Sequence, residues 1–270
     1  MTDAYYERID QSDSLGERFG ATDYVRSAWD STIQNGAPVS ALLVRALERC
    51  SPRSDARLTR VVVDLLGPVP ISDELWVVAQ LERTGPKIEL LSAEMLAPSR
   101  NGVLRIVAKA SAWRFAHHDT EELTFAVAPP LRPVTAADRF EVDGDSAQGY
   151  INSLEWRMLT ELHDIPAESW ARPIVHLVAG ETLTPLERLF TVADMANGLG
   201  TRIEMLDWMF MNTDLVVHIH RVPEGEWIGV RAETNYGPDG VGVSAGTLFD
   251  RHGAIAKIQQ AQLLRPRTDE

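Results

Sequence analysis

Two stretches of the chain carry apolar residues at the spacing of an α-helix. From Pro38 to about Cys50 the chain is apolar on almost every side, which predicts a helix enclosed by other structure. The second stretch, Thr184 to Gly198, opens with the Thr-Pro pair typical of a helix start and ends in glycine. On its 3.6-residue period one face holds Leu186, Leu189, Phe190, Ala193 and Asn197, and Glu187, Arg188 and Thr191 point away. Asp194 lies on the shoulder of that face, at the edge of a buried surface.

Apolar runs of strand length surround both helices. After the first helix they cover Thr59–Leu66, Glu74–Arg83, Ile88–Met95 and Val103–Phe115, and after the second Asn212–Arg221, Glu226–Thr234, Val241–Phe249 and Ala254–Leu264. Turn sequences at hairpin spacing separate them. Further strands are predicted over residues 18–29, 153–162 and 172–181.

The order of strand, helix and four strands therefore occurs twice, at an offset of 151 or 152 residues. Landmarks that align are Trp76 with Trp227, Gly85-Pro86 with Gly237-Pro238, Ser92-Ala93 with Ser244-Ala245, and Gly102 with Gly253. This regularity indicates an internal duplication in which each half wraps one helix in a curved sheet, and two such halves can pair edge to edge to remove exposed strand edges. The predicted fold is α+β, a tandem (double) hotdog of two antiparallel sheets, each around one central helix. The boundaries expected are 1–118 for the N-terminal hotdog, 119–149 for a linker and 150–270 for the C-terminal hotdog.

Charge and composition limit the functions open to this chain. A net charge of −13 argues against binding to nucleic-acid backbones and to anionic membrane surfaces. Cys50 is the only cysteine, so no intramolecular disulfide can form. The polar N-terminus is unlike a signal peptide, and no apolar run is long enough to span a membrane. We expect a cytoplasmic protein without a membrane span and without a cofactor.

Several segments resemble one known family. TVADMANGL, NTDLVVHIHR, GEWIGVRAET, GVGVSAGTLFD and AIAKIQQAQLLRPR in the second half, with NGAPVSALLVRALE and the stretch 60–95 in the first, are similar to the double-hotdog acyl-CoA thioesterase-like proteins of actinobacteria. Those proteins are distant relatives of bacterial thioesterase II. The resemblance implies hydrolysis of a fatty or related acyl thioester of CoA or an acyl carrier protein, and curved sheets of this kind commonly pair into homo-oligomers.

The resemblance also implies a site. In thioesterase II a helix Asp, a strand Thr and a late Gln hold the attacking water, and these positions fall on Asp194, on Asn212 with Thr213 beside it, and on Gln260. Asn212 thus replaces a hydroxyl by an amide. Backbone amides near Asn35-Gly36, at the positive end of the first helix, are candidates for stabilising the oxyanion. The alternatives are a capping role for Asp194 and a plain turn at Asn35-Gly36.

Other motifs favour structural interpretations. Gly242 to Gly246 fits the G-x-S-x-G pattern, but the segment continues as a strand and therefore does not predict a nucleophile elbow. Asp214, His218 and His220 are of types that bind metals, but no further ligand lies at a recognisable spacing from them. We therefore interpret them as a polar strand face. The arginines at 45, 49, 57 and 60 are interpreted as solvated surface rather than as phosphate ligands.

Superposing the two helix starts places Leu47 where the second helix has Asp194, which predicts one active site per chain. A non-catalytic acyl-CoA or lipid-binding protein is the alternative function, favoured by the replacement at Asn212. A hydratase or dehydratase is disfavoured because no His follows Asp194 closely; the next is His218.

Overall fold

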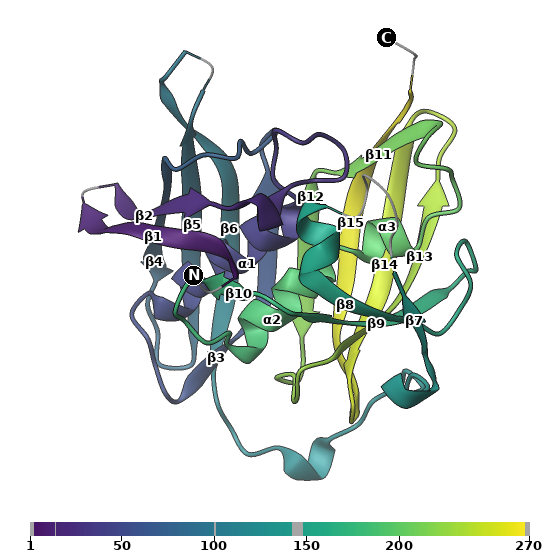
Figure 1. The fold of residues 1–270 in the computed structure, drawn as a ribbon. Coiled ribbons are helices and arrows are strands. Elements are labelled where there is room, and N and C mark those ends of the chain that lie inside the picture. Colours follow the sequence, from purple (N-terminus) through teal and green to yellow (C-terminus); the bar gives the residue numbers. More distant parts are fainter. Residues whose placement is uncertain (1–2, 14, 100, 142–147, 268–270) are drawn as a thin grey trace.

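The computed structural model describes residues 3–13, 15–99, 101–141 and 148–267 (Figure 1). The first-half strands are β1 (Ala4–Asp13), β2 (Gly16–Ala21), β3 (Ala56–Leu65), β4 (Leu75–Arg83), β5 (Ile88–Pro98) and β6 (Leu104–Ala116). Those that follow are β7 (Asp138–Phe140), β8 (Leu154–Met158), β9 (Ala167–Pro173), β10 (His176–Val178), β11 (Trp208–Asn212), β12 (Asp214–Ile219), β13 (Ile228–Tyr236), β14 (Val241–Asp250) and β15 (Gly253–Pro266).

All these strands belong to one hydrogen-bonded sheet, not to two. Its order is β10-β1-β2-β4-β5-β6-β3-β12-β15-β14-β13-β9-β8-β7, with β11 also paired to β15. The order reads alike outward from the central pair, β3 and β12, as the predicted duplication requires. Pairing these two strands removes two exposed sheet edges, so the expectation of two sheets is corrected to a single continuous one. The sheet is antiparallel apart from the β1–β10 pair.

The first helix confirms its predicted enclosure. Helix α1 (Gly36–Arg49) has every residue from Ala37 to Leu47 buried, because the curved sheet and a second helix surround it (Figure 1). The side chain of Asn35 accepts a hydrogen bond from the Ala37 amide at 2.9 Å and so caps its N-terminus.

The second helix is shorter than predicted. Helix α2 (Pro185–Ala193) begins with a capping box between Thr184 and Glu187, as its Thr-Pro start indicated, and ends with Asp194 as its C-cap. A separate single turn, α3 (Ala196–Leu199), follows. The predicted solvent side is also wrong at Glu187 and Thr191, which are 2% and 0% exposed. Helix α1 packs against α2, so α2 has no broad solvent face.

Three further segments differ from expectation. The strand predicted over 172–181 is interrupted, because β9 ends at Pro173 and β10 covers only His176–Val178. The strand predicted over 18–29 ends at Ala21 as β2 and gives way to a 3-10 turn, η1 (Asp23–Val25), while the polar stretch before it forms β1. The segment expected as a linker contains 3-10 turns, η2 (Glu121–Leu123) and η3 (Val134–Ala136), and the strand β7; another such turn, η5 (Gly149–Ser153), precedes β8. Its Leu131 packs against Trp170 and Phe249 in a small second core. The domain boundaries stay a prediction.

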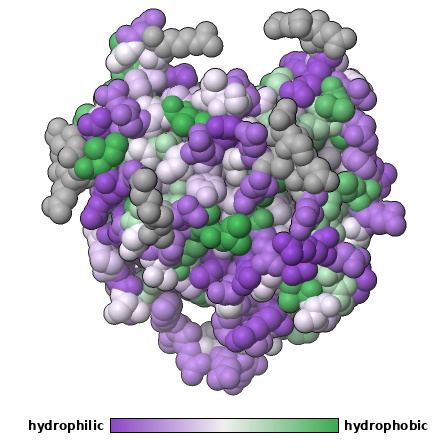
Figure 2. Space-filling model, in the orientation of Figure 1, coloured by the Kyte–Doolittle hydropathy of each residue, from purple (hydrophilic) through white to green (hydrophobic). Residues whose placement is uncertain are grey.

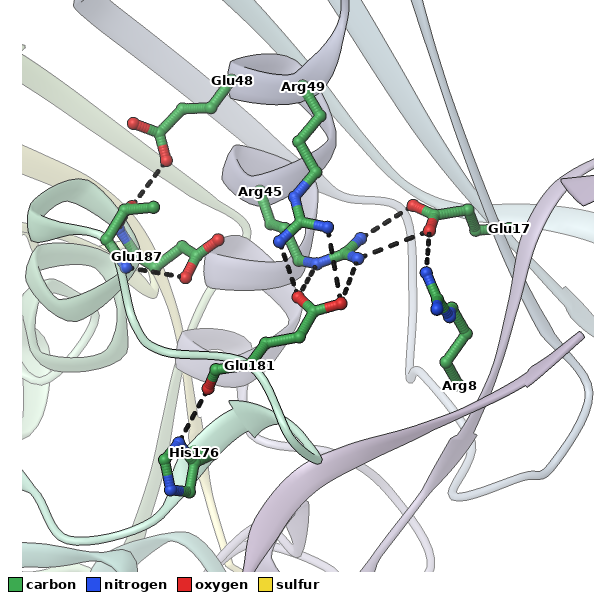
Figure 3. A network of polar contacts seen from close by, with 9 residues as sticks. Arg8, Glu17, Arg45, Glu48, Arg49, His176, Glu181 and Glu187 are labelled. Carbon is green, nitrogen blue, oxygen red and sulfur yellow. Dashed lines mark hydrogen bonds and ion pairs between the residues drawn. The ribbon is translucent and has the colours of Figure 1, made fainter. Parts of the chain in front are cut away.

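A buried ion network joins the halves. Arg45 is 1% exposed, so its interpretation as solvated surface is wrong. Its guanidinium donates to Glu17 at 2.7 Å and to Glu181 at 2.8 Å, and Arg49 also binds Glu181 (Figure 3). The surface seen in Figure 2 is mostly hydrophilic, with small scattered apolar patches. Within the described ranges, no helix has the length and apolar character needed to cross a bilayer.

Candidate active site

The C-terminal end of α2 carries the candidate catalytic carboxylate. Asp194 is 6% exposed. Its Oδ1 accepts a hydrogen bond from Nδ2 of Asn212 at 2.7 Å and another from Nε2 of Gln260 at 2.9 Å. Three residues from α2, β11 and β15, up to 66 positions apart in sequence, therefore meet at one oxygen. The structure brings together the helix, strand and late residues that the resemblance singled out.

Further hydrogen bonds fix both amides. Asn212 Nδ2 also donates to the Asp214 carbonyl at 3.1 Å, and Asn212 Oδ1 accepts from Nδ2 of Asn197 at 3.0 Å. Gln260 Nε2 donates in addition to the backbone oxygen of Asp194 at 3.2 Å. Asn197, on α3, was recognised in the sequence only as an amide on an apolar face. Its hydrogen bond to Asn212 depends on the chain turn at residues 194–196, which no local sequence pattern predicted.

Thr213 does not join this group. Its side chain is exposed, and only its backbone is engaged, through the Ala261 carbonyl and the Leu65 amide. Neighbouring residues of an extended chain point to opposite sides, so Asn212 and Thr213 cannot both face Asp194. Asn212 alone occupies the position of the predicted strand residue.

The N-terminus of α1 faces the second carboxylate oxygen. A Cβ atom built on Gly36 would lie 2.6 Å from Asp194 Oδ2, so only glycine permits this approach. No described side chain donates a hydrogen bond to Oδ2. Asp194 is therefore held through one oxygen and presents the other beside the first turn of a helix, where backbone N–H groups and the positive end of the helix dipole favour negative charge. Asn35 caps that helix and does not contact Asp194 by a hydrogen bond.

Burial changes the proton affinity of this carboxylate. It raises the pKa of Asp194 from 3.8 to about 6, while the hydrogen bonds from Asn212 and Gln260 lower the pKa and the charge of Asp214 raises it. Desolvation outweighs the two hydrogen bonds. A carboxylate with this pKa is largely ionised at neutral pH and is a stronger base than a solvated one, as a general base requires.

The competing motifs do not form the sites that they resemble. Ser244 lies in the middle of strand β14, so the G-x-S-x-G pattern forms no strand-to-helix elbow. Asp214 Oδ1 accepts a hydrogen bond from the Ala261 amide, and the His220 ring bonds the Ala254 carbonyl. Among the residues that the structure describes, no group of three His, Cys, Asp or Glu side chains could hold a metal ion.

Solved structures share this fold across the whole chain. A hotdog-fold protein of Alicyclobacillus acidocaldarius superposes with a TM-score of 0.73 at 14% identity, covering 95% of this chain and 96% of its own. A candidate thioesterase II of Thermobifida fusca YX gives 0.70 at 16% identity, covering 98% of both. Acyl-CoA thioesterase II TesB2 of Mycobacterium marinum gives 0.65 at 13% identity, covering 86% of this chain and 90% of its own. The protein is thus of the hotdog class.

Sequence comparison identifies the family. Residues 25–115 match the acyl-CoA thioesterase N-terminal domain, and residues 129–264 match the acyl-CoA thioesterase C-terminal domain. The chain belongs to the acyl-CoA thioesterase family, and its enzymatic class is that of the thioester hydrolases. Among curated protein sequences, none matches this chain.

Proposed function

We propose that this protein hydrolyses acyl-CoA or acyl-carrier thioesters through a water molecule activated by Asp194. The observation that carries this proposal is the arrangement of the buried carboxylate. Two amides fix its Oδ1, and its Oδ2 is left to accept a proton beside the N-terminus of α1. With a pKa of about 6, Asp194 is ionised and competent at neutral pH.

The reaction needs no covalent enzyme intermediate. Water attacks the thioester carbonyl carbon while Asp194 accepts one of its protons, and the C=O bond becomes an oxyanion. The first-turn amides of α1 at Gly36 are placed to stabilise that charge. The C–S bond then breaks, the carbonyl re-forms, and the thiolate takes the proton from Asp194. The products are a carboxylic acid and a thiol.

Asn212 has a positioning role in this scheme. Its Nδ2 is committed to Asp194 and to the Asp214 carbonyl, so it sets the orientation of the base and leaves that amide nitrogen unavailable to the water. Gln260 also holds Oδ1 but keeps its Oε1 without a partner among the described residues, and this oxygen is available to orient the water. Where thioesterase II has a threonine hydroxyl, this chain thus has an asparagine that supports the carboxylate.

The same replacement favours the second candidate, an acyl-CoA-binding protein that does not turn over. One experiment separates the two. Free thiol released from a panel of acyl-CoAs is measured for the wild type, for Asp194→Ala and for Asp64→Ala, which changes an exposed aspartate of β3. We expect turnover by the wild type and the control, and a loss of about 100-fold or more in Asp194→Ala.

Undiminished turnover in Asp194→Ala would refute the role of the carboxylate. Calorimetric binding of acyl-CoA without any thiol release by the wild type would instead establish the binding protein. Cytoplasmic location and homo-oligomer formation stay predictions.

A further inference from the structure

Unpartnered polar groups gather beside the candidate base. Twelve buried side-chain nitrogen and oxygen atoms have no hydrogen-bond partner within the described part of the chain, and five of them belong to four residues. These residues, which we name the polar row, are Thr234, Ser244, Gln260 and Gln262, exposed by 8%, 1%, 1% and 3%. The concentration of such atoms in one place points to a specific role.

The polar row occupies adjacent strands on the inner face of the sheet. Thr234 of β13 pairs with Ser244 of β14, and Ser244 pairs with Gln260 of β15. Gln262, two residues further along β15, faces the same way and pairs with Asn212. Helix α3 packs over these strands. Since Gln260 donates to Asp194, the row begins at the candidate base and extends away from it across the sheet.

The other half of the sheet shows that the fold does not require these polar groups. Ala79, Ala93 and Ala110 pair in register on β4, β5 and β6. Ala110 pairs with Val63, and Val63 pairs with Leu215. Val216 pairs with Gln259, which sets Leu215 beside Gln260 and completes a single line across the sheet.

This line is symmetric about the pair Val63 and Leu215, at which the two halves of the sheet meet. Ala110, Ala93 and Ala79 are thus the structural counterparts of Gln260, Ser244 and Thr234. Three alanines stand in the half whose helix has Leu47 in place of the carboxylate. At these three pairs of positions, polar side chains stand only in the half that has Asp194, and we therefore connect them with the chemistry at that carboxylate.

The chemistry of the row defines its ligand. Hydroxyl and carboxamide groups both donate and accept hydrogen bonds and carry no charge, so they suit a neutral hydroxyl or carbonyl group. The negative charge of Asp194 disfavours an anion at the same place. Leaving buried polar atoms unpaired costs their full desolvation free energy, so a partner that pairs with them is bound strongly.

We propose that the polar row recognises acyl groups that carry a hydroxyl or oxo group on the third carbon. This inference rests on the proposed function and names its substrate class. A thioester carbonyl at Asp194 and Gln260 places its third carbon two bonds away. Ser244 lies one strand spacing, about 4.8 Å, from Gln260 along the row. In this proposal the hydroxyl of Ser244, the next residue of the row after Gln260, is the partner of the oxygen on the third carbon.

The test compares butanoyl-CoA, 3-hydroxybutanoyl-CoA and 3-oxobutanoyl-CoA, and the same three esters with eight carbons. We expect kcat/KM to be about tenfold higher for the substituted esters, the factor that one good hydrogen bond supplies. Ser244→Ala and Thr234→Val should each lower kcat/KM for the substituted esters relative to the unsubstituted ones and so remove this preference. The matched control is Ser92→Ala, because Ser92 lies on the outer side of β5 and binds Glu82.

A second measurement does not depend on turnover. Asp194→Asn is titrated calorimetrically with the same esters, with and without Ser244→Ala. We expect the 3-hydroxyacyl ester to bind about tenfold more tightly, and this difference to disappear in the double variant. Equal Kd values, or a preference that survives Ser244→Ala and Thr234→Val, would overturn the inference and leave the row as a site for internal water. Tight selective binding by Asp194→Asn, together with no thiol release by the wild type, would uphold it and refute the hydrolytic function.

Discussion

The variant Asp194→Asn should stabilise the protein while inactivating it. The ionised carboxylate of Asp194 is 6% exposed and has no cationic partner among its described hydrogen bonds, so the folded state bears the cost of its desolvation. An asparagine of the same shape removes this charge and keeps an oxygen that can accept from Asn212 and Gln260. A residue placed for catalysis at the expense of stability is expected to behave in this way.

The magnitude follows from the pKa. Burial raises the pKa of Asp194 from 3.8 to about 6, so the folded state holds the proton more tightly than the unfolded state does. The free energy of unfolding of the wild type therefore decreases as pH rises from 3.8 to about 6, and it stays lower above that range. The difference corresponds to about 3 kcal/mol at neutral pH, at 1.36 kcal/mol for each pKa unit.

The assay is urea unfolding of wild type and Asp194→Asn at pH 7.5 and at pH 4. We expect the variant to be more stable by about 3 kcal/mol at the higher pH, with most of this difference lost at the lower pH, where the wild-type carboxyl is protonated in the fold. The wild-type kcat/KM should in parallel fall about tenfold per pH unit below 6. A stability difference of equal size at both pH values would refute the reasoning.

Two other predictions concern the packing around the site. Gly36→Ala places a methyl group 2.6 Å from the buried carboxylate oxygen, so we expect a fall of about 100-fold in kcat with an unchanged circular dichroism spectrum. Gly198→Ala, which meets no atom within 4 Å, is the control, and equal activity of both variants would contradict the geometry. Glu181→Gln leaves the buried guanidinium of Arg45 with one carboxylate and should cost about 3 kcal/mol in urea unfolding. Glu226→Gln removes an exposed ion pair with Arg172 and should lower the free energy of unfolding by less than about 1 kcal/mol. Equal losses in the two variants would show that burial does not determine how much these ion pairs stabilise the fold.

Much of the fold could be predicted because its signals are local. The apolar period of α1, the Thr-Pro start of α2 and the alternation along the β14 and β15 strands each arise within a dozen residues. The pairing of β3 with β12 could not be predicted in this way, since it depends on which edges remain unpaired after both halves fold. The end of α2 at Ala193 had no sequence signal either, since Met195 and Ala196 are good helix formers. At this turn Asp194 accepts hydrogen bonds from Asn212 of β11 and Gln260 of β15, which are distant in the sequence.

The candidate site was predicted from the family resemblance, which left one choice of residue open. Asp194 and Gln260 lie together as the resemblance implies, whereas choosing between Asn212 and Thr213 needed the direction of each side chain. The polar row could not be predicted from the sequence for a similar reason. An offset of 152 aligns Ser92 with Ser244, but Ser92 faces outward and Ala93 is the inward residue. A shift of one residue reverses every side chain of a strand, so sequence alignment alone hid the contrast between alanine and serine.

The symmetric strand order bears on how such an enzyme can specialise. Two identical subunits joined at a central strand pair would carry the same residue on both sides of the axis, and any substitution would appear twice. Here one polypeptide supplies both sides, joined by the segment that runs beneath the sheet in Figure 1. An internal duplication of this kind permits one side to retain apolar residues such as Ala93 and Leu47 at positions where the other side has polar ones. The other side can then acquire polar groups, and the packing of the apolar side compensates for the stability that these groups cost.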